Sequence, residues 1–250
     1  MAMKIHTLIK ILPIFILLLS SCKKLKEKKL ATLKVNFQTE LNQNNFDLTG
    51  RFADAQNRQI QLELVKFYLS DLIFVNDKGE EVPTDEIVLI ELDMNGKASF
   101  ETKIEAGTYT AFKFGVGVPK ALNESDPSIF ADADHPLNST NNTYWGMNSM
   151  YRFVMIDGRF FDENDVFVGT FSYHTGRNES YRNVELVKTM TFDKKANHEE
   201  TIFIDVAKIL EGSGGNLDIE EHSNYHGNTE DFYLSEQLSD NFQQVFRFKN

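Results

Sequence analysis

The sequence predicts an all-β protein: an antiparallel β-sandwich that carries a long polar loop and one or two short helices. Three observations predict it. Apolar side chains recur at every second position, turn residues separate the apolar runs, and patterns of helical period are scarce. Period-two spacing puts alternate side chains on opposite faces of a strand, so one face can be buried. The 21 phenylalanines and 8 tyrosines fit this prediction, because aromatic residues pack well on a pleated surface.

Strands are expected wherever this alternation is clear: residues 33–37, 61–68, 72–75, 108–118, 151–157, 166–174 and 202–206. The continuous apolar run Ile87–Leu92 suits a strand that is covered on both faces. Asn95-Gly96 predicts a tight hairpin, because such turns need positive φ at their central residues. Helical spacing is confined to one or two turns at 206–211 and a short amphipathic helix at 233–244.

The first 22 residues have the form of a bacterial lipoprotein signal. Lys4 and Lys10 come before the apolar run Ile11–Leu19, and Leu19-Ser20-Ser21-Cys22 matches a lipobox. The apolar run is too short to span a membrane as a helix. We therefore expect residues 1–21 to be a signal peptide, residues 22–30 to be the lipidated Cys22 and its tether, and residues 31–250 to fold as one domain.

Composition limits the partners of this domain. Cys22 is the only cysteine, so its lipidation leaves neither a disulfide nor a thiolate ligand. Removing Lys4 and Lys10 from the 26 basic residues leaves 24 against 37 acidic ones, a formal charge near −13. Such a surface repels phosphate backbones and argues against nucleic-acid binding. We expect an extracytoplasmic protein that is anchored to a bacterial membrane by the lipid on Cys22 and faces the periplasm.

The long polar loop, Lys120–Met150, interrupts the strand pattern. Loops of this length are usually functional or disordered. This one contains a histidine, His135, and the only tryptophan, Trp145, which favours function. Met147, Met150 and Met155 lie close to Trp145 in the sequence.

Imidazole and thioether side chains are the residues that suggest a metal site. Imidazole is a common ligand of copper and zinc, and thioethers suit Cu(I). Taken singly, each signal has an ordinary structural explanation: a His-Pro turn, a histidine bonded to a carbonyl, solvated loop histidines, or a tryptophan that anchors packing. The histidines that follow the signal peptide are His135, His174, His198, His222 and His226, of which His198 lies in a polar turn.

The order of several short motifs resembles the MbnP-like family of periplasmic copper-binding proteins. The motifs are Phe67-Tyr68-Leu69-Ser70-Asp71-Leu72, His135-Pro136, Tyr144-Trp145-Gly146-Met147-Asn148, Tyr151-Arg152-Phe153 and Tyr173-His174-Thr175-Gly176. The resemblance runs from about Leu33 to Phe248, nearly the whole chain after the signal peptide.

The resemblance implies a β-sandwich that binds copper, with Cu(I) favoured over Cu(II), and a nearby tryptophan that is oxidised to kynurenine in some members. It makes His135 and His174 candidate copper ligands, with His222 and His226 matching a looser C-terminal stretch. Trp145 would be the oxidisable residue, and Tyr144 would help to shield the metal. Met147 stands where the family often has a second aromatic residue, and it could be a soft ligand instead. A di-haem peroxidase-like protein is the implied partner.

The sequence also bears on two other classes of function, an interaction module and a hydrolase. Tyr144 and Trp145 on a polar loop would also suit a non-enzymatic module that binds a glycan or an envelope protein. Proximity of His135 to His174 would favour copper over that module. A hydrolase is not expected: Asp162-Glu163-Asn164-Asp165 looks like a hairpin turn, and glycosidase chemistry needs two carboxylates facing each other across a cleft.

Overall fold

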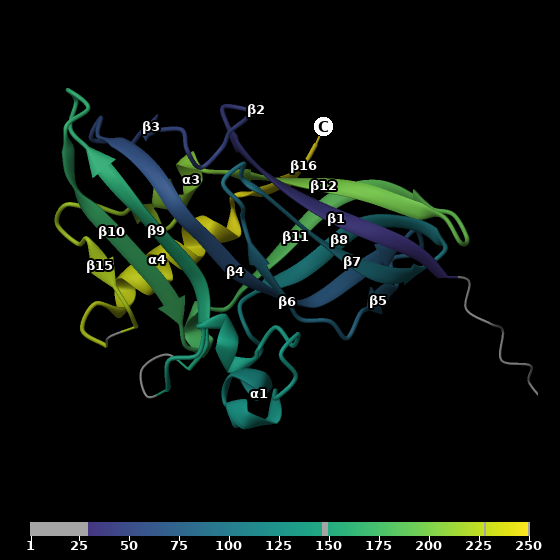
Figure 1. Cartoon of the computed structure of the whole chain (residues 1–250). Coiled ribbons are helices and arrows are strands. Elements are labelled where there is room, and N and C mark those ends of the chain that lie inside the picture. Colours follow the sequence, from purple (N-terminus) through teal and green to yellow (C-terminus); the bar gives the residue numbers. More distant parts are fainter. Residues whose placement is uncertain (1–29, 147–149, 228, 250) are drawn as a thin grey trace, which may run out of the picture.

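The computed structural model describes residues 30–146, 150–227 and 229–249, which form two packed β-sheets (Figure 1). In the described residues the smaller sheet has five strands: β1 (Leu30–Leu41), β2 (Asn44–Asn45), β7 (Lys97–Glu105), β12 (Asn197–Asp205) and β16 (Phe246–Phe248). The larger has nine: β3 (Phe52–Ala53), β4 (Gln59–Asn76), β5 (Glu81–Pro83), β6 (Val88–Glu91), β8 (Gly107–Val116), β9 (Arg152–Phe161), β10 (Phe167–Gly176), β11 (Arg182–Phe192) and β15 (Asn224–Tyr225). A separate ribbon pairs β13 (Glu211–Gly212) with β14 (Gly215–Asn216).

The predicted all-β sandwich is confirmed, but its strands are not all antiparallel. β1 pairs with β12 in parallel, and β10 pairs with β15 in parallel. Parallel neighbours need a long crossover, whereas a short turn joins antiparallel ones. Most strands of the larger sheet lie between β1 and β12 in the sequence, and about fifty residues separate β10 from β15. The local alternation that predicts strands contains no information on these distant pairings.

The core forms where the predicted apolar faces of the two sheets meet. Ala31, Leu33, Val35 and Phe37 are buried, while the residues between them are half-buried. β4 is a single strand of 18 residues rather than two runs, and Asp71 at φ 48° marks the irregularity between the predicted runs. It pairs with β3, β5, β6, β8 and β9, so it is the central strand of the larger sheet.

The predicted C-terminal helix is α4 (Phe232–Gln243), and it completes this core. Its residues Leu234, Leu238 and Phe242 are buried. The Phe242 ring lies 5.1 Å from the Phe67 ring and 5.4 Å from the Phe246 ring, both in edge-to-face geometry. The predicted short turn is α3 (Ala207–Leu210). Gly96, at φ 70°, occupies the predicted turn between β6 and β7.

A cap, residues 120–144, covers part of the outer face of the larger sheet (Figure 1). The predicted polar loop therefore has local structure: α1 (Lys120–Asn123) and the 3₁₀ turns Pro127–Ile129 and Ser139–Asn141. Beneath it a second cluster of Tyr68, Val118, Leu137, Tyr151 and Phe153 is fully buried. Ile87 and Leu89 pack against this cluster, while Ile90 joins the main core, so β6 is covered on both faces as predicted.

Tyrosine hydroxyls attach the cap to the sheet. The Tyr68 hydroxyl donates to the Pro136 carbonyl at 2.8 Å, and the Tyr151 hydroxyl donates to the Leu137 carbonyl at 2.9 Å. Both bonds are shielded from water, where hydrogen bonds fix a loop more firmly. A further 3₁₀ turn, Asn178–Ser180, follows β10. Within the described residues no helix has the length and apolar character needed to cross a membrane.

Replacing Phe242 by alanine should destabilise the fold strongly. The change would leave a cavity between α4 and both sheets, for which large-to-small core substitutions cost about 3–5 kcal/mol. Val187→Ala is the matched control, because Val187 is 79% exposed and should change the free energy of unfolding by less than about 0.5 kcal/mol. Urea denaturation of the two variants measures both values, and equal effects would contradict the packing described for α4.

Candidate functional site

The candidate site begins at the hairpin of β9 and β10. Phe171 and Tyr173 of β10 enter the core, so Ser172 and His174 project from the outer face. In the register of the hairpin, Ser172 lies opposite Asp157 and His174 lies opposite Met155. Directly opposed residues share a face and have adjacent Cβ atoms. The sheet therefore places a carboxylate and a thioether beside His174.

Asp157 fixes the orientation of His174. The Asp157 Oδ1 atom lies 2.9 Å from His174 Nε2 and also accepts from the Ser172 hydroxyl at 2.6 Å. His174 is 7% exposed, so this contact with the carboxylate is largely shielded from water. Burial raises the pKa of Asp157, but the hydrogen bonds from His174 and Ser172 outweigh burial, and the pKa lies below its usual range. The carboxylate is therefore ionised and favours a proton on His174 Nε2.

β15 brings a second histidine to the same place. The Ser172 amide donates to the Ser223 carbonyl at 2.8 Å, and Tyr225 is buried beside Tyr173. His226 follows β15 directly, and its Nδ1 atom lies 3.1 Å from His174 Nδ1. The two rings meet edge to face at 4.7 Å. With its proton on Nε2, His174 presents an unprotonated Nδ1, so His226 donates through its own Nδ1–H.

Trp145 and Arg152 form the wall next to His226. The Trp145 ring lies 5.4 Å from the His226 ring, and the Arg152 guanidinium lies 4.0 Å above the Trp145 ring. Burial lowers the pKa of His226, and the neighbouring His174 and Arg152 lower it further, while Asp157 acts in the opposite direction. The ring of His226 is thus favoured in its neutral form, which is the form that ligates metals.

The comparisons with known proteins agree with this fold. The family model MbnP matches residues 31–229. The chain belongs to the MbnP family. A structure search finds MbnP from Methylosinus trichosporium with a TM-score of 0.51 and 16% sequence identity, covering 80% of this chain and 82% of that one. Identity at this level shows the fold alone. No curated protein sequence matches the chain.

Membership in the MbnP family suggests a metal- or copper-associated protein that works outside the cytoplasm. Family membership does not by itself define the metal ligands, which depend on where the structure places the predicted residues. His174 and His226 come together. Asp157, which brings a carboxylate to the pair, is not identified by sequence analysis. The only hint of it in the sequence is its place in the predicted strand that precedes the strand carrying His174.

His135 and His222 have other contacts. His135 Nδ1 accepts from the Leu137 amide at 3.0 Å, and its ring stacks on Phe130 at 4.6 Å. No contact between His135 and His174 is found among the described residues. The proximity of these two histidines that would favour copper over an interaction module is therefore not found, and the histidine that lies against His174 is His226. His222 Nε2 lies 3.0 Å from the Tyr233 hydroxyl.

Of the remaining predicted residues, Tyr144 and Trp145 are described and Met147 and Cys22 are not. Tyr144 packs on Tyr151 at 5.0 Å and belongs to the cluster beneath the cap rather than to the wall beside His226. Trp145 is 40% exposed. Met147 and Cys22 lie outside the described residues. Among the described residues no group of three or more His, Cys, Asp or Glu side chains is arranged to hold a metal ion.

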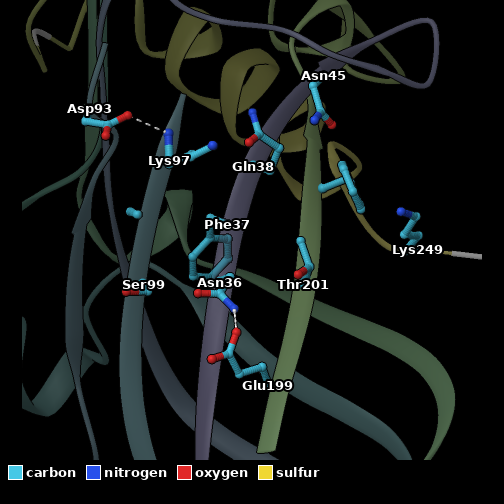
Figure 2. Close-up of a pocket in the computed structure, with 12 residues that line it drawn as sticks. Asn36, Phe37, Gln38, Asn45, Asp93, Lys97, Ser99, Glu199, Thr201 and Lys249 are labelled. Atoms are coloured by element: carbon cyan, nitrogen blue, oxygen red, sulfur yellow. Dashed lines mark hydrogen bonds between the residues drawn. The ribbon is translucent and has the colours of Figure 1, made fainter. Parts of the chain in front are cut away.

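A separate hollow of about 520 Å³ opens on the outer face of the smaller sheet (Figure 2). Asn36 and Gln38 of β1, Ser99 of β7 and Thr201 of β12 line it, and the Asn36 amide donates to Glu199 at 3.2 Å. Acidic and basic side chains also line it, but none of its lining residues is a histidine or a methionine. The hollow therefore lacks the imidazole and thioether ligands that suit copper and is distinct from the histidine pair.

The hydrogen-bond chain predicts an unusual tautomer for His226. In the metal-free protein at pH 8, His174 should carry its proton on Nε2 and His226 should carry its proton on Nδ1, the less common position for a neutral histidine in water. Long-range ¹H–¹⁵N correlation spectra of the imidazole rings distinguish the two nitrogens. In Asp157→Ala the preference of His226 should weaken, because His174 loses the partner that fixes its ring. A His226 ring protonated on Nε2 in the parent protein would rule out the proposed hydrogen bond from His226 Nδ1–H to His174 Nδ1.

Proposed function

We propose that the chain is a binding protein rather than an enzyme, and that it holds one copper ion between His174 and His226. The supporting observation is the facing pair of Nδ1 atoms, 3.1 Å apart. A metal with bonds of about 2 Å to two imidazole nitrogens holds those nitrogens about 3 to 4 Å apart, for bond angles from about 100° to linear. The shared proton of the metal-free pair occupies the place that the ion would take.

The surroundings of the pair support a ligand role for both rings. Asp157 binds the far nitrogen of His174, which is the arrangement that orients metal-ligating histidines and makes them better donors. Burial and neighbouring positive charge lower the pKa of His226, which favours the neutral ring. Copper, when bound, would supply a Lewis-acidic centre. The residues of the chain provide the donors, their orientation and, around His174, a largely buried environment.

Cu(I) is the oxidation state that this donor set fits best. Cu(I) accepts two or three soft or borderline ligands, whereas structural zinc sites need four. Met155 faces His174 across the hairpin and is 7% exposed, so a buried thioether lies beside the imidazole pair. Met155 joins neither of the two apolar clusters, so the core does not account for its burial. An ion held by so few protein ligands would remain exchangeable, as sequestration followed by transfer requires.

A competition titration tests the proposal. The full chain carrying Cys22→Ser, in a non-ionic detergent and without oxygen, would be titrated with Cu(I) against a chromophoric chelator; the substitution removes a thiol that would itself bind Cu(I). We expect one tight equivalent per chain and a loss of affinity of at least 100-fold in both His174→Ala and His226→Ala.

The control variants are His135→Ala and His198→Ala. His135 is engaged with Leu137 and Phe130, and His198 accepts from the Asp193 amide on the other sheet, so neither should change the affinity more than about two-fold. A stoichiometry well below one would refute the copper proposal. Equal losses in all four variants would show that copper binds elsewhere.

We further propose that Cys22 carries a lipid that anchors the domain to a bacterial membrane on its periplasmic side. The lipobox and the acidic charge of the chain support this, because such a surface gains little from an anionic membrane. In a bacterium that processes lipoproteins, a labelled fatty acid should appear in the parent protein and be absent from Cys22→Ala. Labelling that persists in the variant would overturn this assignment. A di-haem peroxidase-like partner is a further proposal that rests on the family, and the partial exposure of Trp145 is compatible with it.

A further inference from the structure

Arg152 carries a positive charge that the described residues leave unpaired. It lies at the start of β9, and its guanidinium covers the Trp145 ring at 4.0 Å. No hydrogen bond or ion pair to another described residue reaches this guanidinium, and its Nε atom is buried without a partner. Burial lowers the pKa of Arg152, which Asp157 only partly offsets. The charge therefore bears a cost of desolvation that the Trp145 ring offsets, among the described residues, without any acidic partner.

Other arginines of the same protein show the contrast. Arg58 is buried, and its guanidinium binds Asp54 and Asp218, each at 2.7 Å. Arg51 lies 3.5 Å from the centre of the Phe161 ring, much as Arg152 lies over Trp145, yet Arg51 also pairs with Asp165. The chain has 37 acidic residues against 26 basic ones, so carboxylates are not scarce. The absence of a described partner at Arg152 is a local property of the site.

Arg177 is a second arginine of this kind. In the β9–β10 register Arg152 lies opposite Gly176, and Arg177 follows Gly176 directly. Its Nη2 atom donates to the Gly227 carbonyl at 3.2 Å, next to His226, and its Nε atom is buried without a partner. Its backbone has φ 65°, a left-handed conformation that costs a non-glycine residue free energy. No acidic partner of Arg177 is found among the described residues.

We propose that Arg152 and Arg177 bind a small oxyanion beside the histidine pair. A planar guanidinium presents several donors in a fixed fork that suits carboxylate and phosphate groups. In both arginines the Nε–H is buried and has no hydrogen-bond partner. Arg152 contacts the Trp145 ring, which in turn contacts His226, while Arg177 donates directly to the Gly227 carbonyl. A bound oxyanion would supply the missing counter-charge. This site goes beyond the copper proposal, because its ligand is an anion and its occupation needs no metal.

Trp145 provides the reporter for the test. It is the only tryptophan, and it contacts Arg152, so a change at that guanidinium should alter its fluorescence. Metal-free full chain carrying Cys22→Ser would be titrated with sodium acetate or inorganic phosphate at constant ionic strength. A saturable change with acetate identifies a carboxylate site, and a saturable change with phosphate identifies a phosphate site. A linear response to both would overturn the proposal.

Variants separate binding from the reporter signal. Arg152→Gln and Arg177→Gln should each weaken the anion at least ten-fold, measured by calorimetry because the first change also removes the contact with Trp145. Arg51→Gln is the matched control: it removes an arginine over an aromatic ring that already has an acid partner, and the anion affinity should stay the same. Circular dichroism confirms folding of each variant. Binding that survives in Arg152→Gln and Arg177→Gln, or is lost equally in Arg51→Gln, would refute the assignment, whether or not the protein binds copper.

Discussion

The pairing of β10 with β9 along one edge and with β15 along the other is the constraint on which the histidine site depends. The first pairing puts Asp157 within hydrogen-bond distance of His174, and the second brings His226 to the remaining nitrogen of the same ring. β15 is only two residues long, and the burial of Tyr225 and the hydrogen bond from the Ser172 amide to the Ser223 carbonyl help to hold it in place. Burial of a tyrosine in the core thus helps to place His226 on the outer face.

The sandwich core and the cap position different residues of this site. The main core fixes β9 and β10 from the inner side through Val154, Ile156, Phe171 and Tyr173. The cap covers a neighbouring part of the outer face and reaches Trp145 through the bridge between Tyr144 and Tyr151. The aromatic wall beside His226 is therefore attached to a buried cluster, although Trp145 itself is partly exposed. A long polar segment can hold one functional side chain in place when a few apolar anchors such as Leu137 attach it to a sheet.

Sequence patterns predict the fold better than they predict the site. The alternation of Leu33, Val35 and Phe37, the turn at Gly96 and the apolar stripe of α4 each depend on neighbours in the chain, so the sequence contains them directly. The site depends on register. Phe161 pairs with Phe167, but the bulge at Val168 shifts the hairpin by one residue, so that Asp157 rather than Ile156 faces Ser172. Likewise, no local pattern indicates that a two-residue strand brings His226, and not His135, to His174.

The central claim is that two imidazole nitrogens share one ion in the place where the metal-free protein keeps one proton. The Asp157 carboxylate orients the His174 ring, and burial favours the neutral form of His226. Both effects favour replacement of the shared proton by a metal ion. X-ray absorption spectroscopy at the copper edge of the Cu(I)-loaded protein tests it most directly. The account predicts two imidazole nitrogens at about 2 Å, recognisable by scattering from the outer atoms of their rings. A copper shell with one imidazole or none would contradict it.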